Sequence, residues 1–370
     1  MKAIADSVEE LIGNTPLLRT HRALNDLPLG YWLKEQGVSK APSQLKSELL
    51  VKLEFFNPGG SVKDRIAKHI ITQAEKRGEI KKGATIVEAT SGNTGAGLAL
   101  IAALRGYKAI LVMPDKMSAE KINALRAFGA SVVISPSEVS SEDPNYYCNV
   151  AKRLSQEIPN AFLANQYFNP DNPQAHYETT GPEIWNQTEG KLDVFIAGIG
   201  TGGTMSGIAR YLKEKNPKIK IVGVDPKGSI YTNLFKTGKI FGYERYLVEG
   251  IGEDVLPGSM DLKLMDECVT VKDDESFSMT RILAEREAIL VGGSCGSAYF
   301  GAVQYLQKHE AEGGKPLRAL VLLPDSGSRY LSKVFNDGWL NEKKLPTEWG
   351  AFKPAGKISY IDGAKKVPGV

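Results

Sequence analysis

The sequence predicts an α/β protein with parallel-rich sheets flanked by helices. Short apolar runs typical of buried strands alternate with helix-like runs through most of the 370 residues. This order favours parallel sheets with helices on both faces. Glycine-rich segments begin near residues 57, 90, 198 and 292, and three of them directly follow an apolar, strand-like run. Ligands bind at such strand ends in α/β sheets, so these loops are where we expect function.

The elements can be assigned in chain order. A continuous apolar run such as residues 192–197 is typical of a buried strand. The expected strands are 84–89, 108–113, 131–135, 192–197, 219–224 and 318–323. The expected helices are 66–76, 94–104, 118–128 and 204–215.

Three segments lack such a pattern. Prolines and serines between Ser135 and Asn172 predict a break in the regular structure. The polar connection 28–49 has no readable motif, and the tail 346–370 is expected to be irregular.

Composition limits the function classes. The length suggests two domains, and a net charge of +3 gives no argument for nucleic acid. No apolar run is long enough to span a membrane and the N-terminus lacks a signal-peptide pattern, so we expect a cytoplasmic protein. Three cysteines without CxxC pairing and four scattered histidines predict neither disulfides nor a metal site.

One lysine follows a Pro-Gly-Gly turn and precedes a helix-like run, in the segment 57–65 (NPGGSVKDR). The glycines let the backbone turn tightly and approach a ligand closely. Ser61 can cap the helix, whose free N–H groups suit anions. Lysine forms Schiff bases with carbonyl cofactors such as pyridoxal phosphate (PLP), which makes Lys63 the candidate catalytic residue. The same pattern also occurs at ordinary helix starts.

Two further glycine-rich loops follow predicted strands. The loop 90–95 (TSGNTG) offers hydroxyls, an amide and backbone N–H groups, a set that suits a small carboxylate. The loop 198–204 (GIGTGGT) can cradle a phosphate through backbone N–H groups. A phosphate-bearing aldehyde cofactor accounts for both loops and for Lys63.

The loop 198–204 also supports a different class of protein. Residues 198–203 have GxGxxG spacing, and Asp225 ends the next strand, where a dinucleotide fold keeps its ribose-binding acid. An NAD-dependent dehydrogenase is therefore an alternative, although it leaves Lys63 and the loop 90–95 unexplained.

The fourth loop, 292–297 (GGSCGS), places a neutral hydroxyl before a helical run. Ser294 could hydrogen-bond a pyridine nitrogen without keeping it protonated, which favours β-elimination over reactions that need a stronger electron sink. The serine could also be an ordinary helix cap. Cys295 is expected to be a small packed residue, since nothing local marks an activated thiolate.

Together these four motifs resemble the PLP enzymes of fold type II, the tryptophan-synthase-β-like group, and within it the cysteine synthase/cystathionine β-synthase family. The resemblance runs from about Ile12 to Trp339 and implies a two-domain fold. Segments similar to the cystathionine β-synthase branch are 225–229, 248–252, 293–297, 324–326 and 329–339. Residues 176–185, in contrast, are more similar to cysteine synthases.

The resemblance implies roles for individual residues. Lys63 matches the lysine that binds the cofactor, Asn93 the residue that contacts its 3′-oxygen, and Ser294 the partner of its pyridine nitrogen. The matching phosphate-binding residues are Gly200, Thr201, Gly202, Gly203 and Thr204. The matching substrate-binding residues are Thr90, Ser91, Gly92, Thr94, Gln166, Tyr167 and Gly252.

The resemblance also implies a layout and a reaction. An N-terminal domain would comprise 48–165, with a mobile part at about 88–135, and a C-terminal phosphate-binding domain would comprise 1–47 and 166–345. The chain starts about where the catalytic core of haem-bearing relatives starts, so PLP without haem is expected. The resemblance also implies a homodimer. The implied reaction is β-replacement, which condenses L-serine with L-homocysteine to cystathionine in transsulfuration and cysteine biosynthesis. Cysteine synthase, using O-acetylserine and sulfide, remains the alternative.

Overall fold

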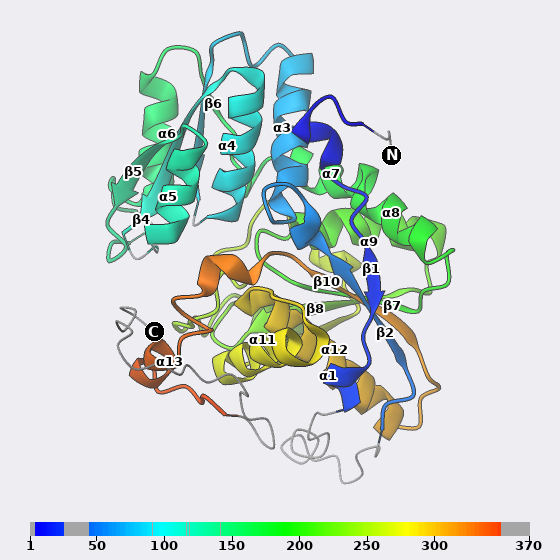
Figure 1. Cartoon of the computed structure of the whole chain (residues 1–370). Coiled ribbons are helices and arrows are strands. Elements are labelled where there is room, and N and C mark those ends of the chain that lie inside the picture. Colours follow the sequence, from blue (N-terminus) through cyan, green and yellow to red (C-terminus); the bar gives the residue numbers. More distant parts are fainter. Residues whose placement is uncertain are drawn as a thin grey trace, which may run out of the picture.

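Two β-sheets organise the chain in this computed structural model, one of six strands and one of four (Figure 1). The structure describes residues 4–25, 44–90, 92–115, 117, 119–140 and 142–348. The six-stranded sheet lies in the lower part of Figure 1 and the four-stranded sheet in the upper part.

The six-stranded sheet is parallel except at one edge, where β1 runs antiparallel to β2. Its strands in spatial order are β1 (Leu17–Arg19), β2 (Glu48–Leu53), β10 (Arg318–Leu323), β7 (Val194–Gly198), β8 (Lys220–Pro226) and β9 (Glu267–Val271).

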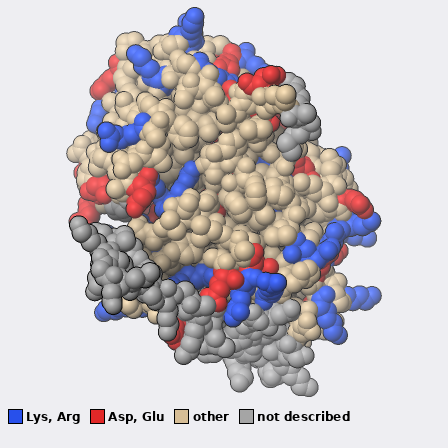
Figure 2. Space-filling model, in the orientation of Figure 1, with Lys and Arg blue, Asp and Glu red and all other residues tan. Residues whose placement is uncertain are grey.

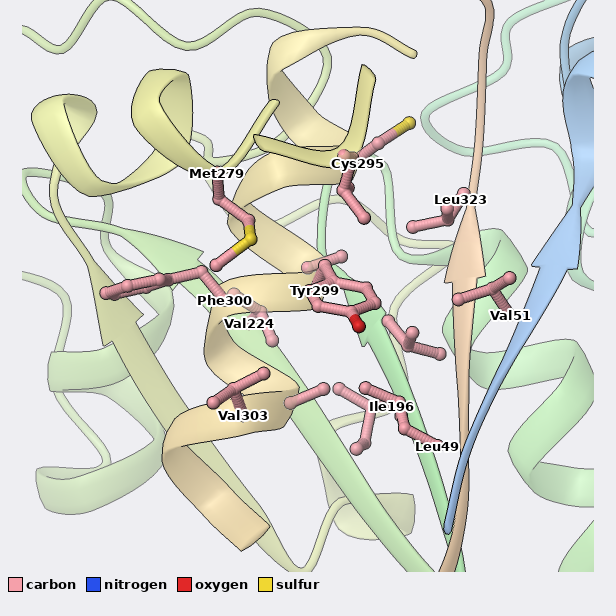
Figure 3. Packing of buried hydrophobic residues seen from close by; sticks show 14 of the residues in the cluster. Leu49, Val51, Ile196, Val224, Met279, Cys295, Tyr299, Phe300, Val303 and Leu323 are labelled. Carbon is pink, nitrogen blue, oxygen red and sulfur yellow. The ribbon is translucent and has the colours of Figure 1, made fainter. Parts of the chain in front are cut away.

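Both faces of this sheet are covered by helices. Ala319, Val321 and Leu323 of β10 pack with α11 (Asp273–Glu287) and α12 (Gly293–Ala311), whereas the alternating residues pack with α9 (Gly203–Lys215) on the other face. Figure 3 shows side chains of α12 packing over those of the strands. A strand buried on both faces needs apolar residues at every position, which explains the continuous apolar runs in the sequence.

The four-stranded sheet is parallel throughout and is also covered on both faces. Its strands in spatial order are β5 (Ser131–Ser135), β4 (Lys108–Pro114), β3 (Thr85–Ala89) and β6 (Ala161–Leu163). One face packs against α3 (Lys63–Lys76), α4 (Asn93–Arg105) and α5 (Ala119–Ala127), and the other against α6 (Tyr147–Glu157). The remaining α-helices in the described ranges are α1 (Arg22–Asn25), α7 (Asp171–Glu178), α8 (Thr180–Gln187), α10 (Tyr231–Thr237) and α13 (Asp337–Glu342).

The expected strands are confirmed to within two residues at each end, as are three of the four expected helices. The helix expected at 66–76 begins earlier, at Lys63. The break expected between 135 and 172 is wrong, because α6 and β6 lie there. Pro144 and Pro159 flank α6, and Pro170 precedes α7, so these prolines mark the ends of elements.

Some predictions fall partly outside the described residues. These include residues 28–43 of the polar connection and 349–370 of the tail; residues 346–348 are irregular, as expected. The division into domains stays a prediction. The strand β2, which falls in the predicted N-terminal domain 48–165, pairs with β10 in the six-stranded sheet.

No helix in the described ranges has the length and apolar character needed to cross a membrane. On the face in Figure 2, basic and acidic side chains are interspersed.

We expect Ile196→Ala to lower the free energy of unfolding by about 2–5 kcal/mol, because Ile196 is fully buried under α12 and truncation leaves a cavity. The matched control is Leu104→Ala on α4, whose side chain is 43% exposed and whose loss should stay within about 0.5 kcal/mol. Urea unfolding followed by tryptophan fluorescence measures both changes. A loss for Ile196→Ala as small as that of the control would contradict this packing.

Candidate active site

The loop that carries Lys63 is held against the loop that follows β10. Ser61 pairs with Asp325 in a short antiparallel bridge. The Val62 amide donates to the Pro324 carbonyl oxygen at 2.8 Å, and the Ser326 amide donates to the Gly60 carbonyl oxygen at 3.1 Å. Lys63 is therefore fixed at the carboxyl end of the six-stranded sheet, where α/β proteins bind ligands.

Lys63 is the first residue of α3, and its surroundings favour a neutral amine. Its backbone amide donates to Ser61 Oγ at 3.2 Å, although the N-cap position itself is Val62. Burial lowers the pKa of Lys63 to about 8, while the carboxylates of Glu253 and Asp325 oppose the shift. At neutral pH a larger fraction of this amine is unprotonated than in an ordinary lysine.

The Pro-Gly-Gly turn is fixed by a buried carboxyl group. Asp64 Oδ2 accepts a hydrogen bond from the Gly59 amide at 2.5 Å, and a Cβ at Gly59 would lie 2.4 Å from Asp64 Oδ1. Arg329 donates to the Gly59 carbonyl oxygen and to Asn93 Oδ1. Only glycine fits at position 59, so the turn sequence has a steric reason.

A buried network of ion pairs surrounds Arg65, two residues after Lys63. The Arg65 guanidinium, 1% exposed, donates to Glu54 Oε2 at 2.7 Å and to Glu183 Oε1 at 2.7 Å. Lys52 Nζ, also buried, donates to Glu183 Oε2 at 2.9 Å, and Thr15 Oγ1 donates to Glu54 Oε1 at 2.6 Å. Burial opposes ionisation of Glu54, but Arg65 outweighs it and holds the pKa of Glu54 below its ordinary value.

Asn93 begins α4 and joins the four-stranded sheet to the six-stranded one. Its Nδ2 donates to Asp325 Oδ2 at 2.7 Å, and the Tyr330 hydroxyl donates to the same oxygen at 2.6 Å. Asp325 was not among the predicted site residues. Its position in the motif 324–326 was the available signal.

The predicted substrate residues gather at the end of β3. Thr90 Oγ1 accepts from the amides of Gly92 and Gly95 at 3.1 and 3.2 Å. Thr94 Oγ1 donates to Gln166 Oε1 at 2.5 Å. Ser91 lies outside the described residues. Thr90, Gly92, Thr94 and Gln166 are thus adjacent, as the sequence predicts.

The loop 200–204 after β7 is closely packed and has no room for side chains at its glycines. A Cβ at Gly200 would lie 2.6 Å from the Gly250 carbonyl oxygen, and one at Gly203 would lie 2.1 Å from Asn172 Oδ1. Gly202 has φ +84°, which favours glycine. The backbone N–H groups of this loop precede α9, an arrangement that suits a phosphate.

The hydroxyls of the same loop are held by buried polar side chains. Asn172 Nδ2 donates to Thr201 Oγ1 at 3.2 Å, and Thr204 Oγ1 lies 3.1 Å from His176 Nε2. Burial lowers the pKa of His176 well below its ordinary value, so this histidine is neutral. It supports the loop through its contact with Thr204.

Ser294 lies at the start of α12, 3% exposed, close to the loop that contains Gly252. A Cβ at Gly250 would lie 3.9 Å from Ser294 Oγ. In the described part of the chain, no protein group hydrogen-bonds this hydroxyl. Gly252, at φ +77°, donates its amide to the Ile199 carbonyl oxygen at 2.7 Å.

Tyr167 is the last of the predicted site residues. Its carbonyl oxygen accepts a hydrogen bond from the Ser259 amide at 3.1 Å, and Ser259 Oγ donates to the Thr201 carbonyl oxygen at 2.6 Å. Ser259 thereby joins Tyr167 to the loop 200–204. Cys295 beside them is fully buried, and burial raises the pKa of its thiol well above the ordinary value. This confirms the packed role expected for Cys295.

The residues present fit PLP as a cofactor. The chain offers an amine of lowered pKa at Lys63, an amide-rich loop at 200–204 and an unpartnered hydroxyl at Ser294. These groups suit an aldehyde, a phosphate and a pyridine nitrogen respectively. In the described residues, no group of three or more His, Cys, Asp or Glu could hold a metal ion.

The dinucleotide alternative fits less well. Asp225 Oδ2 accepts from the Thr232 amide at 2.8 Å and from Thr232 Oγ1 at 2.9 Å. The carboxyl group is buried and holds the start of α10, so it is not presented to a ribose.

The chain belongs to the family of pyridoxal-phosphate-dependent enzymes, which it matches over residues 8–325. It is 45% identical to the cystathionine β-synthases of Apis mellifera, over 332 residues, and of Dictyostelium discoideum, over 342 residues. The matches cover 90% and 92% of this chain but 62% and 63% of those proteins. The chain thus spans about three-fifths of the length of these relatives.

Two solved structures are similar at 38% sequence identity. A hydrogen sulfide-producing enzyme from Fusobacterium nucleatum has a TM-score of 0.76, covering 89% of this chain and 99% of that one. An O-acetylserine-dependent cystathionine β-synthase from Helicobacter pylori has a TM-score of 0.75, covering 89% and 98%. These comparisons confirm the predicted PLP fold type II and favour it over the dehydrogenase alternative.

We expect Arg65→Met to lower the free energy of unfolding by about 3–5 kcal/mol, because Glu54 and Glu183 would be left buried without their shared cation. Arg77→Met at the end of the same helix is the control, since that arginine is 43% exposed and its ion pairs contribute at most about 1 kcal/mol. Urea unfolding of both variants measures the difference. Equal losses would show that the Arg65 network does not stabilise the fold.

Proposed function

We propose that the protein catalyses a PLP-dependent β-replacement, which condenses L-serine with L-homocysteine to cystathionine. The observation that carries this proposal is the buried Lys63 amine beside the substrate and phosphate loops, in a chain 45% identical to cystathionine β-synthases. The wider assignments, a cytoplasmic homodimer in transsulfuration and cysteine biosynthesis, are part of the same proposal.

The cofactor would be held by residues from both sheets. Lys63 would bind it covalently, the amides of residues 200–204 would hold its phosphate, and Ser294 would face its pyridine nitrogen. Asn93 would contact the 3′-oxygen. One N–H of Asn93 Nδ2 is used by Asp325, which leaves the second available for this contact.

PLP, when bound, supplies an electron sink for the charge that develops at the α-carbon of the substrate. The Lys63 amine, once released, acts as the base that removes the proton from this α-carbon. The same lysine then donates a proton to the leaving hydroxyl of serine. The lowered pKa of Lys63 supports both steps, because a group with a pKa near 8 can accept and return a proton at neutral pH.

The substrate carboxylate would be bound at the end of β3. Backbone N–H groups at the start of α4 and the hydroxyls of Thr90 and Ser91 would donate to it, with Gln166 alongside. The Thr94 hydroxyl, which donates to Gln166 in this structure, would turn to the carboxylate when the substrate binds. Tyr167 and Gly252 would border the substrate. The adjacency of Thr94 and Gln166 supports this assignment, as does the N-terminal end of α4, which favours an anion.

We propose that the N-terminal domain 48–165 closes on the domain formed by 1–47 and 166–345, with residues 88–135 as the moving part. Support comes from contacts that join this part to the rest: Lys121 forms an ion pair with Glu249, and Asn93 is hydrogen-bonded to Asp325. Closure would exclude water from the reaction.

Lys63→Ala is expected to abolish both turnover and the visible absorption of covalently bound cofactor, while the protein stays folded. The control is Lys76→Ala, an exposed lysine on the same helix, which should keep both properties. Circular dichroism checks the fold, and absorbance and cystathionine formation check the function. Near-normal β-replacement by Lys63→Ala would refute the assignment.

Titration of the purified holoenzyme separates the substrates. We expect the cofactor absorbance to change on adding L-serine and to return when L-homocysteine is added, with cystathionine as product. A response to O-acetylserine but not to serine, with sulfide as the preferred thiol, would favour cysteine synthase. The Helicobacter pylori structure, named as O-acetylserine-dependent, is the observation that keeps O-acetylserine in the test.

A further inference from the structure

Glu253 lies on a segment next to the loop after β7, and its carboxyl group is close enough to Lys63 to raise the pKa of that amine. Its amide donates to Ser229 Oγ at 3.1 Å, and its carbonyl oxygen accepts from the Ile230 amide at 3.1 Å. The preceding residue, Gly252, is bonded to Ile199 just after β7. The side chain therefore starts from a rigid segment at the carboxyl ends of β7 and β8.

Within the described residues this carboxyl group forms no ion pair, unlike Glu249 and Glu54. Glu249, four residues earlier, forms ion pairs with Lys121 and Lys333. Glu54 is paired with Arg65. In the ranges that the structure describes, no Lys, Arg or His forms an ion pair with Glu253.

A cation beside Glu253 would stabilise the ionised form of its carboxyl group. Burial and the neighbouring Asp254 raise the pKa of Glu253 to about 8, while Lys63 and Tyr167 oppose the shift. A carboxyl group in such a place is costly to ionise alone, and an added positive charge beside it favours the ionised form.

Two tyrosines, Tyr167 and Tyr146, act on Glu253 or are affected by it. Burial and Glu253 raise the pKa of Tyr167 well above its ordinary value, and burial raises the pKa of Tyr146 to about 12. These tyrosines stay neutral, and the Tyr167 side chain is hydrogen-bonded to the Glu253 carboxyl group. Specific sites commonly combine apolar and aromatic lining with a few polar groups that fix orientation.

We propose that Glu253 binds the ammonium group of the second substrate, and thereby selects an amino-acid thiol over sulfide. This inference rests on the proposed β-replacement. The amino group of the first substrate would be taken up by the cofactor, and Lys63 would be occupied with proton transfer at the α-carbon. The ammonium of the incoming thiol amino acid is then the cation that Glu253 can pair with.

The test compares wild type and Glu253→Gln with L-serine and three thiols. These are L-homocysteine, 4-mercaptobutanoic acid, which is the same molecule without its amino group, and sulfide. We expect wild type to have a higher kcat/KM for homocysteine than for the other two thiols. Glu253→Gln should reduce this ratio about 10- to 100-fold, mainly by raising KM for homocysteine, because a charged hydrogen bond to its ammonium group is lost.

The control is Asp254→Asn, which neutralises the adjacent exposed carboxyl group and should keep the preference. The absorbance change caused by serine alone should be the same in wild type and Glu253→Gln, because the first substrate is bound elsewhere. A loss in Glu253→Gln that is equal for homocysteine and 4-mercaptobutanoic acid would overturn the inference, since a base or a structural residue acts on both thiols alike.

An unchanged preference in Glu253→Gln would also overturn it. The wild-type data alone test the reaction on which the inference rests. If wild type turns over no thiol, or only sulfide, the proposed function fails and the role of Glu253 fails with it. If wild type makes cystathionine, the variants decide on Glu253 independently.

Discussion

The Arg65 guanidinium lies two residues beyond Lys63 and is buried between two carboxylates from different parts of the chain. Glu54 follows β2, whereas Glu183 belongs to α8, so the network fixes the start of α3 relative to both. A cation buried with two anions is stable only when its geometry is kept. The position of Lys63 is thereby set by a constraint that lies outside the reacting groups.

A second constraint is the junction between the two sheets. Arg329 donates to the turn before Lys63 and to Asn93, and Asp325 accepts from Asn93. Burial lowers the pKa of the Lys63 amine, whereas the Asp325 carboxylate of this junction opposes the shift. The junction thus fixes the turn before the cofactor lysine and also contributes a charge that acts on its amine.

Much of this architecture could be predicted from sequence because strands buried on both faces leave continuous apolar runs, as at β7 and β10. The strands β1, β2, β6 and β9 are not predicted: β1, β6 and β9 are only partly buried and carry no such run, and Lys52 interrupts the apolar run of β2. The glycine-rich loops were predicted because a close backbone approach excludes side chains at positions such as Gly200 and Gly203. Their meeting at one place depends on sheet order, which no local pattern contains.

Glu253 could not be predicted for a different reason. What distinguishes it from Glu249 is the absence of an ion pair in the described residues, since its carboxyl group is hydrogen-bonded to Tyr167 only, and that is a property of three-dimensional neighbours. Burial raises the pKa of Glu88 and that of Glu253 to about 8. The Glu88 carboxylate, however, accepts hydrogen bonds from backbone amides. A buried acid whose bonding capacity is already used contributes to the fold, whereas one with capacity left can bind a ligand. By this criterion Glu253 belongs with Lys63 and Ser294, the groups that the chain leaves available for chemistry.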